Sequence, residues 1–540
     1  MLNYVWLGLL ILGIGVAIST DLIDKSNNKY QNGKSLQIEV VFQDSIINIE
    51  NKSYKVKLNV NSGRFNSFYN QTIKKDFTQS AKITFNKTSD KKLLFFKVDD
   101  NSPAIWKEMA KVSGKEDDLT GTFLLGKQLS PKIFKGEIIL EDISFAKMKD
   151  VTNSALKYAG IAVEIALGLV GIMALWLGVM KVADDAGLIK IIANFVKPIT
   201  KFLFPDVPQD HPAMGAMIMN IAANMLGLGN AATPFGLKAM EELDKLNPNK
   251  GVATNTMCTF LAVNTAGLTL IPATAIAIRA AAGSSDPAII IGTSIFGALC
   301  ATTVGITASK IMEKFPLKEG GITGLFNSSK KGFIILGLLI LAVFLLIVTG
   351  LMSSLLSFFN PELFKDIIQI ISILAIPMLI LVFIGYGAIK KIKVYEVFVE
   401  GAKEGFDVAV KIIPYLVAML VAIGIFRAGG AMEILIYALT PLTNFIGMPA
   451  EALPMALMRP LSGSGSLGIM AEIMATHGPD SFIGILTSTF FGSTETTFYV
   501  IAVYFGAVNI RKTRHALAAG LLADTAGILG AVFIVKLLFG

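Results

Sequence analysis

Residues 211–245, HPAMGAMIMNIAANMLGLGNAATPFGLKAMEELDK, are apolar but are interrupted by Gly, Asn, Thr and Pro. A second stretch of the same character covers residues 449–477. A continuous membrane helix needs about 20 predominantly apolar residues, and neither stretch supplies them without a break. Irregular backbone is tolerated at membrane depth only where protein or water surrounds it. Both stretches are therefore predicted to be re-entrant helical hairpins, with breaks at Gly227, Gly229, Gly463 and Gly465.

Both breaks also fit the glycine pattern of a dinucleotide-binding loop, as Gly227-Leu-Gly-Asn-Ala-Ala232 and Gly463-Ser-Gly-Ser-Leu-Gly468. That pattern indicates a nucleotide site only where it follows a β-strand and opens a helix. Here the surroundings are apolar helical segments. The glycines are therefore interpreted as breaks that turn a helix inside the membrane.

The composition of the whole chain agrees with a membrane setting. The 540 residues are 53% hydrophobic and 16% charged, with a mean hydropathy of +0.61, whereas soluble domains carry about 25% charged residues. The charge deficit lies in residues 151–540, while residues 20–150 are rich in Lys, Asp, Asn and Thr. The predicted fold class is a mainly α, polytopic membrane protein with an inserted β-rich soluble domain.

Further apolar stretches have the length of membrane helices. Residues 4–18 form the first, and both an uncleaved anchor and a signal peptide stay open for it. The anchor is favoured because no positive side chain precedes the run. The other expected spans are 155–183, 252–279, 287–311, 332–352, 366–389, 397–427, 480–508 and 515–539.

Residues 20–150 show the period of two that is typical of strands. Leu36, Ile38 and Val40 alternate with polar residues, and so do the apolar positions of residues 54–60. Together with breaks at Asn, Asp, Gly and Ser, this alternation predicts a small β-sandwich or half-barrel. One helix is expected near residues 103–112.

Basic residues indicate the orientation in the membrane, because Lys and Arg collect in short cytoplasmic loops. They cluster at residues 181–201, 310–331, 390–393 and 511–514. All four clusters fall on one side if the two broken stretches do not cross. The prediction is then nine crossings of the cytoplasmic (inner) membrane, with residues 20–150 and the C-terminus outside the cytoplasm.

The membrane part repeats itself. Glu164-Ile-Ala-Leu and Pro198-Ile-Thr recur as Asp407-Val-Ala-Val and Pro441-Leu-Thr with the same offset. The predicted orientation makes the two copies inverted, and inverted repeats with broken helices are typical of secondary transporters. The expected domains are a first transmembrane helix (1–19), an extracytoplasmic β-rich domain (20–150), a first membrane repeat (151–315), connecting transmembrane helices (316–395) and a second repeat (396–540).

Long motifs resemble a known family. Residues 211–242, HPAMGAMIMNIAANMLGLGNAATPFGLKAMEE, resemble spore maturation protein A. Residues 413–427 (IPYLVAMLVAIGIFR), 458–465 (MRPLSGSG) and 492–499 (GSTETTFY) resemble spore maturation protein B. The chain is thus identified as a fusion of the two within the nucleoside-recognition, or Gate, family. The resemblance covers residues 1–18 and about 151–540, and it implies a transporter-like membrane architecture without settling the substrate.

Polar residues at the breaks and on the following helices are the candidate site. A charge at the bilayer centre costs about 2.5–3.5 kcal/mol on insertion scales, so Arg459 and Glu495 are expected to be paired, hydrated or both. Glu495 is either a proton or cation site beside an anion-binding Arg459, or the partner of Arg459 in a structural ion pair. The Asn, Ser and Thr residues either bind substrate or satisfy backbone groups freed by the breaks. The candidate substrate-binding residues are Asn220, Asn224, Asn230, Thr233, Asn264, Thr265, Arg459, Ser462, Ser464, Thr494, Glu495 and Thr496.

Other function classes are disfavoured. The sequence has no catalytic triad, phosphate loop or metal-ligand cluster, so no enzyme, cofactor or metal centre is expected. No basic stripe with interleaved aromatic residues predicts nucleic-acid binding. The first hypothesis is a secondary transporter of a small polar solute, nucleoside-like or otherwise. The second is a membrane scaffold whose residues 20–150 recruit an envelope protein, the third is a metal-ion permease, and homo-oligomer formation stays open.

Overall fold

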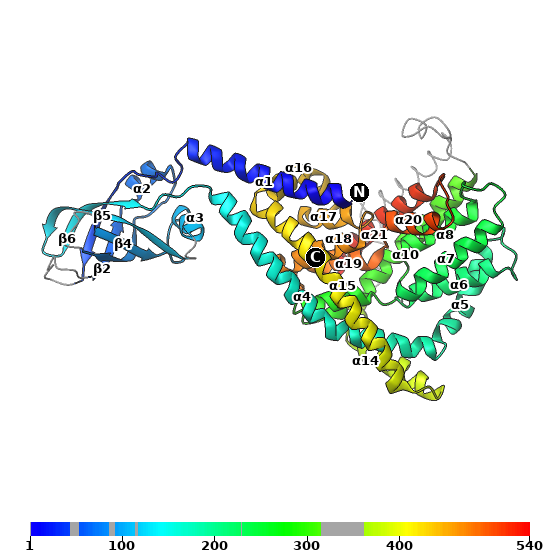
Figure 1. Cartoon of the computed structure of the whole chain (residues 1–540). Coiled ribbons are helices and arrows are strands. Elements are labelled where there is room, and N and C mark those ends of the chain that lie inside the picture. Colours follow the sequence, from blue (N-terminus) through cyan, green and yellow to red (C-terminus); the bar gives the residue numbers. More distant parts are fainter. Residues whose placement is uncertain (1, 44–52, 86–91, 114–116, 228, 315–360) are drawn as a thin grey trace. The chain divides into compact units, whose positions relative to one another are not determined.

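The structure is a computed structural model that describes residues 2–43, 53–85, 92–113, 117–227, 229–314 and 361–540. The chain divides into two compact units (Figure 1). One unit comprises Leu7–Leu156 and Gly424–Ile434, and the other comprises Met1–Trp6, Lys157–Ile423 and Leu435–Gly540. The span expected at 332–352 lies outside the described residues, as does most of the connecting region 316–395.

Six antiparallel strands form a closed barrel in the first unit. Each strand pairs with the next, and the last pairs with the first, for example through Leu36↔Ile138. The expected β-sandwich or half-barrel is therefore corrected to a closed barrel, in which no strand is left as an edge. Period-two alternation reports only which face of a strand is buried, so it could not separate these architectures. The strands are β1 (Leu36–Phe42), β2 (Ser53–Val60), β3 (Phe77–Thr84), β4 (Lys92–Lys97), β5 (Asp118–Ser130) and β6 (Ile133–Leu140).

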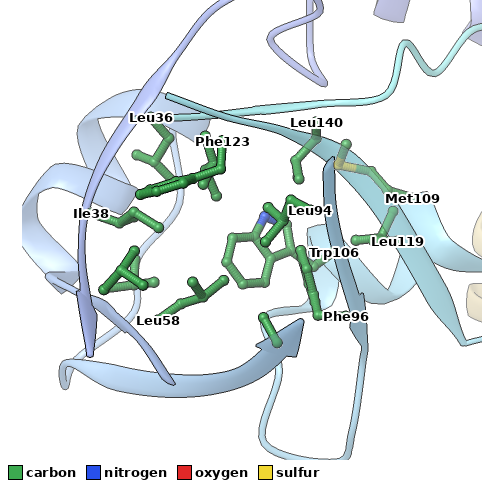
Figure 2. Packing of buried hydrophobic residues seen from close by; sticks show 14 of the residues in the cluster. Leu36, Ile38, Leu58, Leu94, Phe96, Trp106, Met109, Leu119, Phe123 and Leu140 are labelled. Atoms are coloured by element: carbon green, nitrogen blue, oxygen red, sulfur yellow. The ribbon is translucent and has the colours of Figure 1, made fainter. Parts of the chain in front are cut away.

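Two helices complete the barrel unit. Helix α2 (Ser62–Tyr69) connects β2 to β3, and α3 (Ala104–Ser113), the helix expected near 103–112, connects β4 to β5. Helix α3 places Trp106, which is fully buried, among the inward-facing side chains of the strands (Figure 2). The indole lies 5.0 Å from the ring of Phe96 and 5.4 Å from that of Phe65, between centroids. An aromatic core therefore joins both helices to the barrel.

Asp76 holds the start of α2. Its Oδ1 accepts hydrogen bonds from the Ser62 backbone N–H at 2.8 Å and from the Ser62 hydroxyl at 2.7 Å. Asn61, the N-cap residue, accepts a hydrogen bond from the Arg64 backbone N–H at 3.1 Å. The hydrogen bonds from Ser62 are the main reason why the pKa of Asp76 lies below its usual value of 3.8.

We expect Asp76→Asn to make the barrel less sensitive to acid. The folded pKa of Asp76 is the lower one, so its stabilising effect is present above the unfolded pKa and is lost as pH falls through the folded pKa. The unfolding midpoint of the full-length protein, followed from pH 7 down to pH about 3, should therefore fall less in the variant than in the wild type. Asp100→Asn, at an exposed carboxylate on the same unit, is the control. Parallel pH profiles for all three proteins would contradict the role given to Asp76.

Helices α1 (Leu2–Ser26) and α4 (Ala146–Asp185) enter and leave the barrel unit. Asp21 ties them together, because its two carboxylate oxygens accept hydrogen bonds from the backbone N–H groups of Lys147 at 2.8 Å and Met148 at 2.9 Å. These donors belong to the first turn of α4, where N–H groups lack helical partners. The buried Asp21 thus serves as a cap supplied from a distant part of the chain.

Apolar helices make up the second unit. Five described helices are long and apolar enough to cross a membrane: Trp6–Ser26, Ala146–Asp185, Pro287–Lys314, Val394–Ala428 and Ala516–Phe539. The chain is therefore a multi-pass membrane protein. The described α-helices that follow α4 are α5 (Leu188–Leu203), α6 (Pro212–Met225), α7 (Gly229–Lys245), α8 (Asn255–Ala266), α9 (Ala273–Ala281), α10 (Ile290–Lys314), α14 (Pro361–Ile389), α15 (Val394–Ala428), α16 (Ala431–Ile446), α17 (Leu453–Met458), α18 (Gly463–His477), α19 (Phe482–Ser493), α20 (Thr497–Ala507) and α21 (Ala516–Phe539).

Two expected spans are not continuous helices. Residues 252–279 divide into α8 and α9, and residues 480–508 divide into α19 and α20. The first break follows from Gly267, whose φ is +57°, and from Pro272, which has no backbone N–H to continue a helix. The second break follows from the extended backbone of Thr494. Hydropathy averages over such breaks, which is why the sequence predicted one long helix in each place.

The order of helices in the second unit occurs twice. A long helix, a short helix, a helix pair, a broken helix and a final long helix follow one another as α4, α5, α6–α7, α8–α9 and α10, and again as α15, α16, α17–α18, α19–α20 and α21. The final helices of the two sets, α10 and α21, pack closely. A Cβ added to Gly297 of α10 would lie 3.2 Å from the carbonyl oxygen of Gly527 in α21. The broken helices pack on this pair, because α8 and α19 each contact both α10 and α21.

Candidate functional site

The two broken helices meet at their breaks. The backbone N–H of Glu495, in the α19–α20 break, donates a hydrogen bond to the Thr265 carbonyl near the end of α8 at 2.8 Å. A Cβ at Gly267 would lie 2.8 Å from Glu495 Cγ. Gly267 is thus required both for its positive φ and for the close approach of Glu495.

Asparagine side chains form one polar cluster beside the breaks. Asn224 Nδ2 donates to Asn264 Oδ1 at 3.0 Å, and the Tyr504 hydroxyl donates to the same oxygen at 3.4 Å. Asn220 Nδ2 donates to the Tyr504 hydroxyl at 3.2 Å and to the Ala232 carbonyl of α7 at 2.8 Å. Asn220 and Asn264 are buried. Their side chains form hydrogen bonds to neighbouring groups of the protein. Asn224, in contrast, is partly exposed.

Arg459 forms the second polar cluster, on the turn that follows α17. Its Nη2 donates a hydrogen bond to the Thr494 carbonyl, and its Nη1 donates to the Thr496 hydroxyl at 3.4 Å. The Glu495 carboxylate is 3.7 Å from Nη2, and the guanidinium lies 4.4 Å from the centroid of the Phe491 ring. The Arg459 side chain is 2% exposed and that of Glu495 is 49% exposed. Arg459 therefore stabilises the α19–α20 break through hydrogen bonds to two of its residues, while the Glu495 carboxylate stays accessible to solvent.

A further carboxylate lies behind this cluster. Asp524 of α21 is buried, and its Oδ2 accepts a hydrogen bond from the Thr497 hydroxyl at 2.5 Å. Its Oδ1 has no hydrogen-bond partner in the described part of the chain. Asp524 interacts electrostatically with Arg459 and Glu495. The structure thus brings Asp524 next to the residues of the α19–α20 break.

A cavity of about 420 Å³ opens at the breaks. It is bounded by α4, the end of α6, both breaks, the first half of α15 and the end of α19. Asn224, Gly227, Thr494 and Glu495 are the predicted residues that line it. Position 227 requires glycine, because its φ is +78° and a Cβ there would lie 2.7 Å from the Ile271 carbonyl oxygen.

The other predicted residues are not among the described residues that line the cavity. Asn230 lies in the first turn of α7, Thr233 is partly buried on α7, and Thr265 is buried in α8. Ser462 caps α18 by accepting a hydrogen bond from the Gly465 backbone N–H at 3.0 Å. The hydroxyl oxygens of Ser462 and Ser464 are 3.4 Å apart. Gly229 begins α7 and Gly463 begins α18.

Several lining residues were missed by sequence reasoning. They are Lys181 and Asp184 near the end of α4, Thr269 in the first break, Glu404 of α15 and Phe491 of α19. The available signal was charge inside or at the end of an apolar span, which is costly and therefore often functional. Lys181 and Asp184 are also three residues apart on one helix, so they share a face.

Comparison with known proteins agrees with the resemblance seen in the sequence. The Gate family model, described as nucleoside recognition, matches residues 166–314 and 409–511. Spore maturation protein B of Bacillus subtilis (strain 168) is 52% identical over 175 residues, which are 32% of this chain and 98% of that protein. Spore maturation protein A of the same organism is 49% identical over 152 residues, which are 28% of this chain and 78% of that protein. Each relative covers a part of the chain, consistent with a fusion.

Proposed function

We propose, on the premise that this chain belongs to the family of spore maturation proteins A and B, that it is a secondary transporter of a small polar solute. The solute binds in the cavity at the two breaks. The two sets of helices act as inverted repeats, and the pairs α6–α7 and α17–α18 act as re-entrant hairpins. The chain works in the cytoplasmic membrane with residues 20–150 outside, and it catalyses no chemical reaction.

The observation that carries this proposal is the meeting of two helix breaks beside a polar cavity. A volume of about 420 Å³ is within the range of about 300–1,000 Å³ that is usual for small-molecule sites. Discontinuous membrane helices present free backbone groups to a solute and to coupling ions. Alternating access then needs one set of helices to move against the other around this site.

Uptake by the purified protein in lipid vesicles tests the proposal. We expect the wild type to accumulate a solute from a panel of labelled amines, nucleosides, amino acids and dicarboxylates. Glu495→Gln should reduce that uptake at least tenfold, because it removes an accessible charge from the cavity while keeping the shape of the side chain.

Glu433→Gln is the matched control, since Glu433 is exposed on α16 and lines no part of this cavity. Both variants should elute from a sizing column like the wild type. Normal uptake by a correctly folded Glu495→Gln variant would show that the site is assigned wrongly. No uptake of any member of the panel by the wild type would count against transport.

A scaffold function is the second candidate, and the outer surface of the barrel favours it. Leu93 is 64% exposed and Phe95 is 37% exposed, and both point outward from β4. This exposed apolar pair offers a contact for an envelope protein. Replacing residues 33–142 by a short linker, which keeps Asp21 and the start of α4, separates the two functions. If cells with this variant lost the function of the protein in the cell while vesicle uptake of the solute was retained, the scaffold function would be favoured.

A further inference from the structure

We propose that the solute of this cavity is an organic cation carrying an amine. This inference rests on the proposed transport function and names its substrate class. It is carried by two features of the cavity: the side-chain charges and an unpartnered hydroxyl on its wall.

Acidic side chains outnumber basic ones at the cavity. Asp184, Glu404 and Glu495 line it, and Lys181 is the basic residue among the described lining residues. The Lys181 ammonium is paired with Asp185, which lies 3.3 Å away, and Arg459 lies 3.7 Å from Glu495. With these partners included, four carboxylates face two cations. The wall therefore has a surplus of negative charge that a positively charged solute neutralises.

Thr494 supplies a hydrogen-bonding group. It lines the cavity and is 2% exposed, and its hydroxyl has no hydrogen-bond partner among the described residues. Its backbone carbonyl already accepts a hydrogen bond from Arg459. A buried hydroxyl without a partner is unfavourable, and a hydrogen-bond donor of a solute, such as an ammonium N–H, would satisfy it.

The spacing of the acidic groups favours an organic cation over a metal ion. In the part of the chain that the structure describes, no three His, Cys, Asp or Glu side chains are placed to hold one metal ion. Divalent metals require several oxygen ligands at about 2.0–2.6 Å. Carboxylates spread over α4, α15 and the α19–α20 break instead fit an extended molecule whose charge is reached from more than one side.

A matched set of four-carbon compounds tests the inference. The full-length protein in detergent is titrated by calorimetry with 1,4-diaminobutane, 1,4-butanediol and succinate, which have similar length but carry positive, zero and negative charge. Uridine and Mn²⁺ are titrated in parallel. We expect 1,4-diaminobutane to bind at least tenfold more tightly than the other four. Glu404→Gln should weaken its binding about tenfold, while the control Glu433→Gln should leave it unchanged.

The outcomes separate this inference from the proposed function. Tighter binding of uridine, butanediol or succinate, with vesicle uptake of that compound, would overturn the cation preference and leave transport standing. Tighter binding of Mn²⁺ that Glu404→Gln weakens would replace the organic cation by a metal ion. Binding of the diamine that Glu404→Gln does not change would place it elsewhere and overturn the site. Absence of both binding and uptake for every compound would overturn the inference and the transport function together.

Discussion

Replacing Arg459 by methionine should lower the free energy of unfolding of the membrane unit by about 3 kcal/mol and reduce solute uptake to background. The guanidinium holds the Thr494 carbonyl and the Thr496 hydroxyl on the two sides of the break, and it faces Glu495 at 3.7 Å. Leaving a buried acceptor such as the Thr494 carbonyl without its donor costs about 1–3 kcal/mol. The upper end applies here, because the buried Thr496 hydroxyl also loses the hydrogen bond that it accepts from Arg459.

Thermal unfolding in detergent and uptake in vesicles measure the two effects. Arg459→Lys keeps the charge but lacks the planar fork that reaches several oxygens at once, so it should recover only part of the stability and uptake. Arg511→Ala, at an exposed arginine, is the control for loss of positive charge alone. An Arg459→Met protein as stable and active as the Arg511→Ala protein would mean that this cluster has neither role.

Trp106→Ala should destabilise the barrel by about 3–5 kcal/mol, the range for removing a large aromatic side chain from a well-packed core. Trp106 is fully buried and contacts Phe65, Phe77 and Phe96. Its indole N–H also donates to the Tyr69 hydroxyl at 3.4 Å. Because this one residue joins α3 to the strands and to α2, its removal should loosen the whole barrel.

Hydrogen exchange of the full-length protein measures this prediction. Backbone amides of β1–β6 should exchange at least a hundredfold faster in Trp106→Ala, since about 1.4 kcal/mol corresponds to a factor of ten. Amides of α10 and α21, in the other compact unit, should be unaffected. Leu93→Ala, at an outward-facing position of β4, should leave exchange in the strands nearly unchanged. Unchanged exchange in Trp106→Ala would show that the strands alone hold the barrel.

Local patterns predicted the site only in part. Gly227 and Glu495 could be singled out because a glycine break and a charge inside an apolar region are visible in the sequence. The hydrogen bonds of Asn220 could not be predicted, since its amide nitrogen donates to Ala232 and Tyr504, which lie 12 and 284 positions away. Glu404 and Asp184 were missed for the same reason. Nothing local indicates that the first half of α15 and the end of α4 border one cavity.

The sequence by itself determined the membrane character of the chain, the strand-rich insertion, the glycine breaks and the family. Each of these depends on composition, on a period of two or on contiguous motifs, which neighbouring residues carry. Only the tertiary structure decided that β6 closes the barrel against β1, that two expected helices are broken, and that Glu495 meets Gly267 beside an acidic cavity. These features join residues far apart in the chain, and the free energy of such contacts depends on packing that no local pattern records.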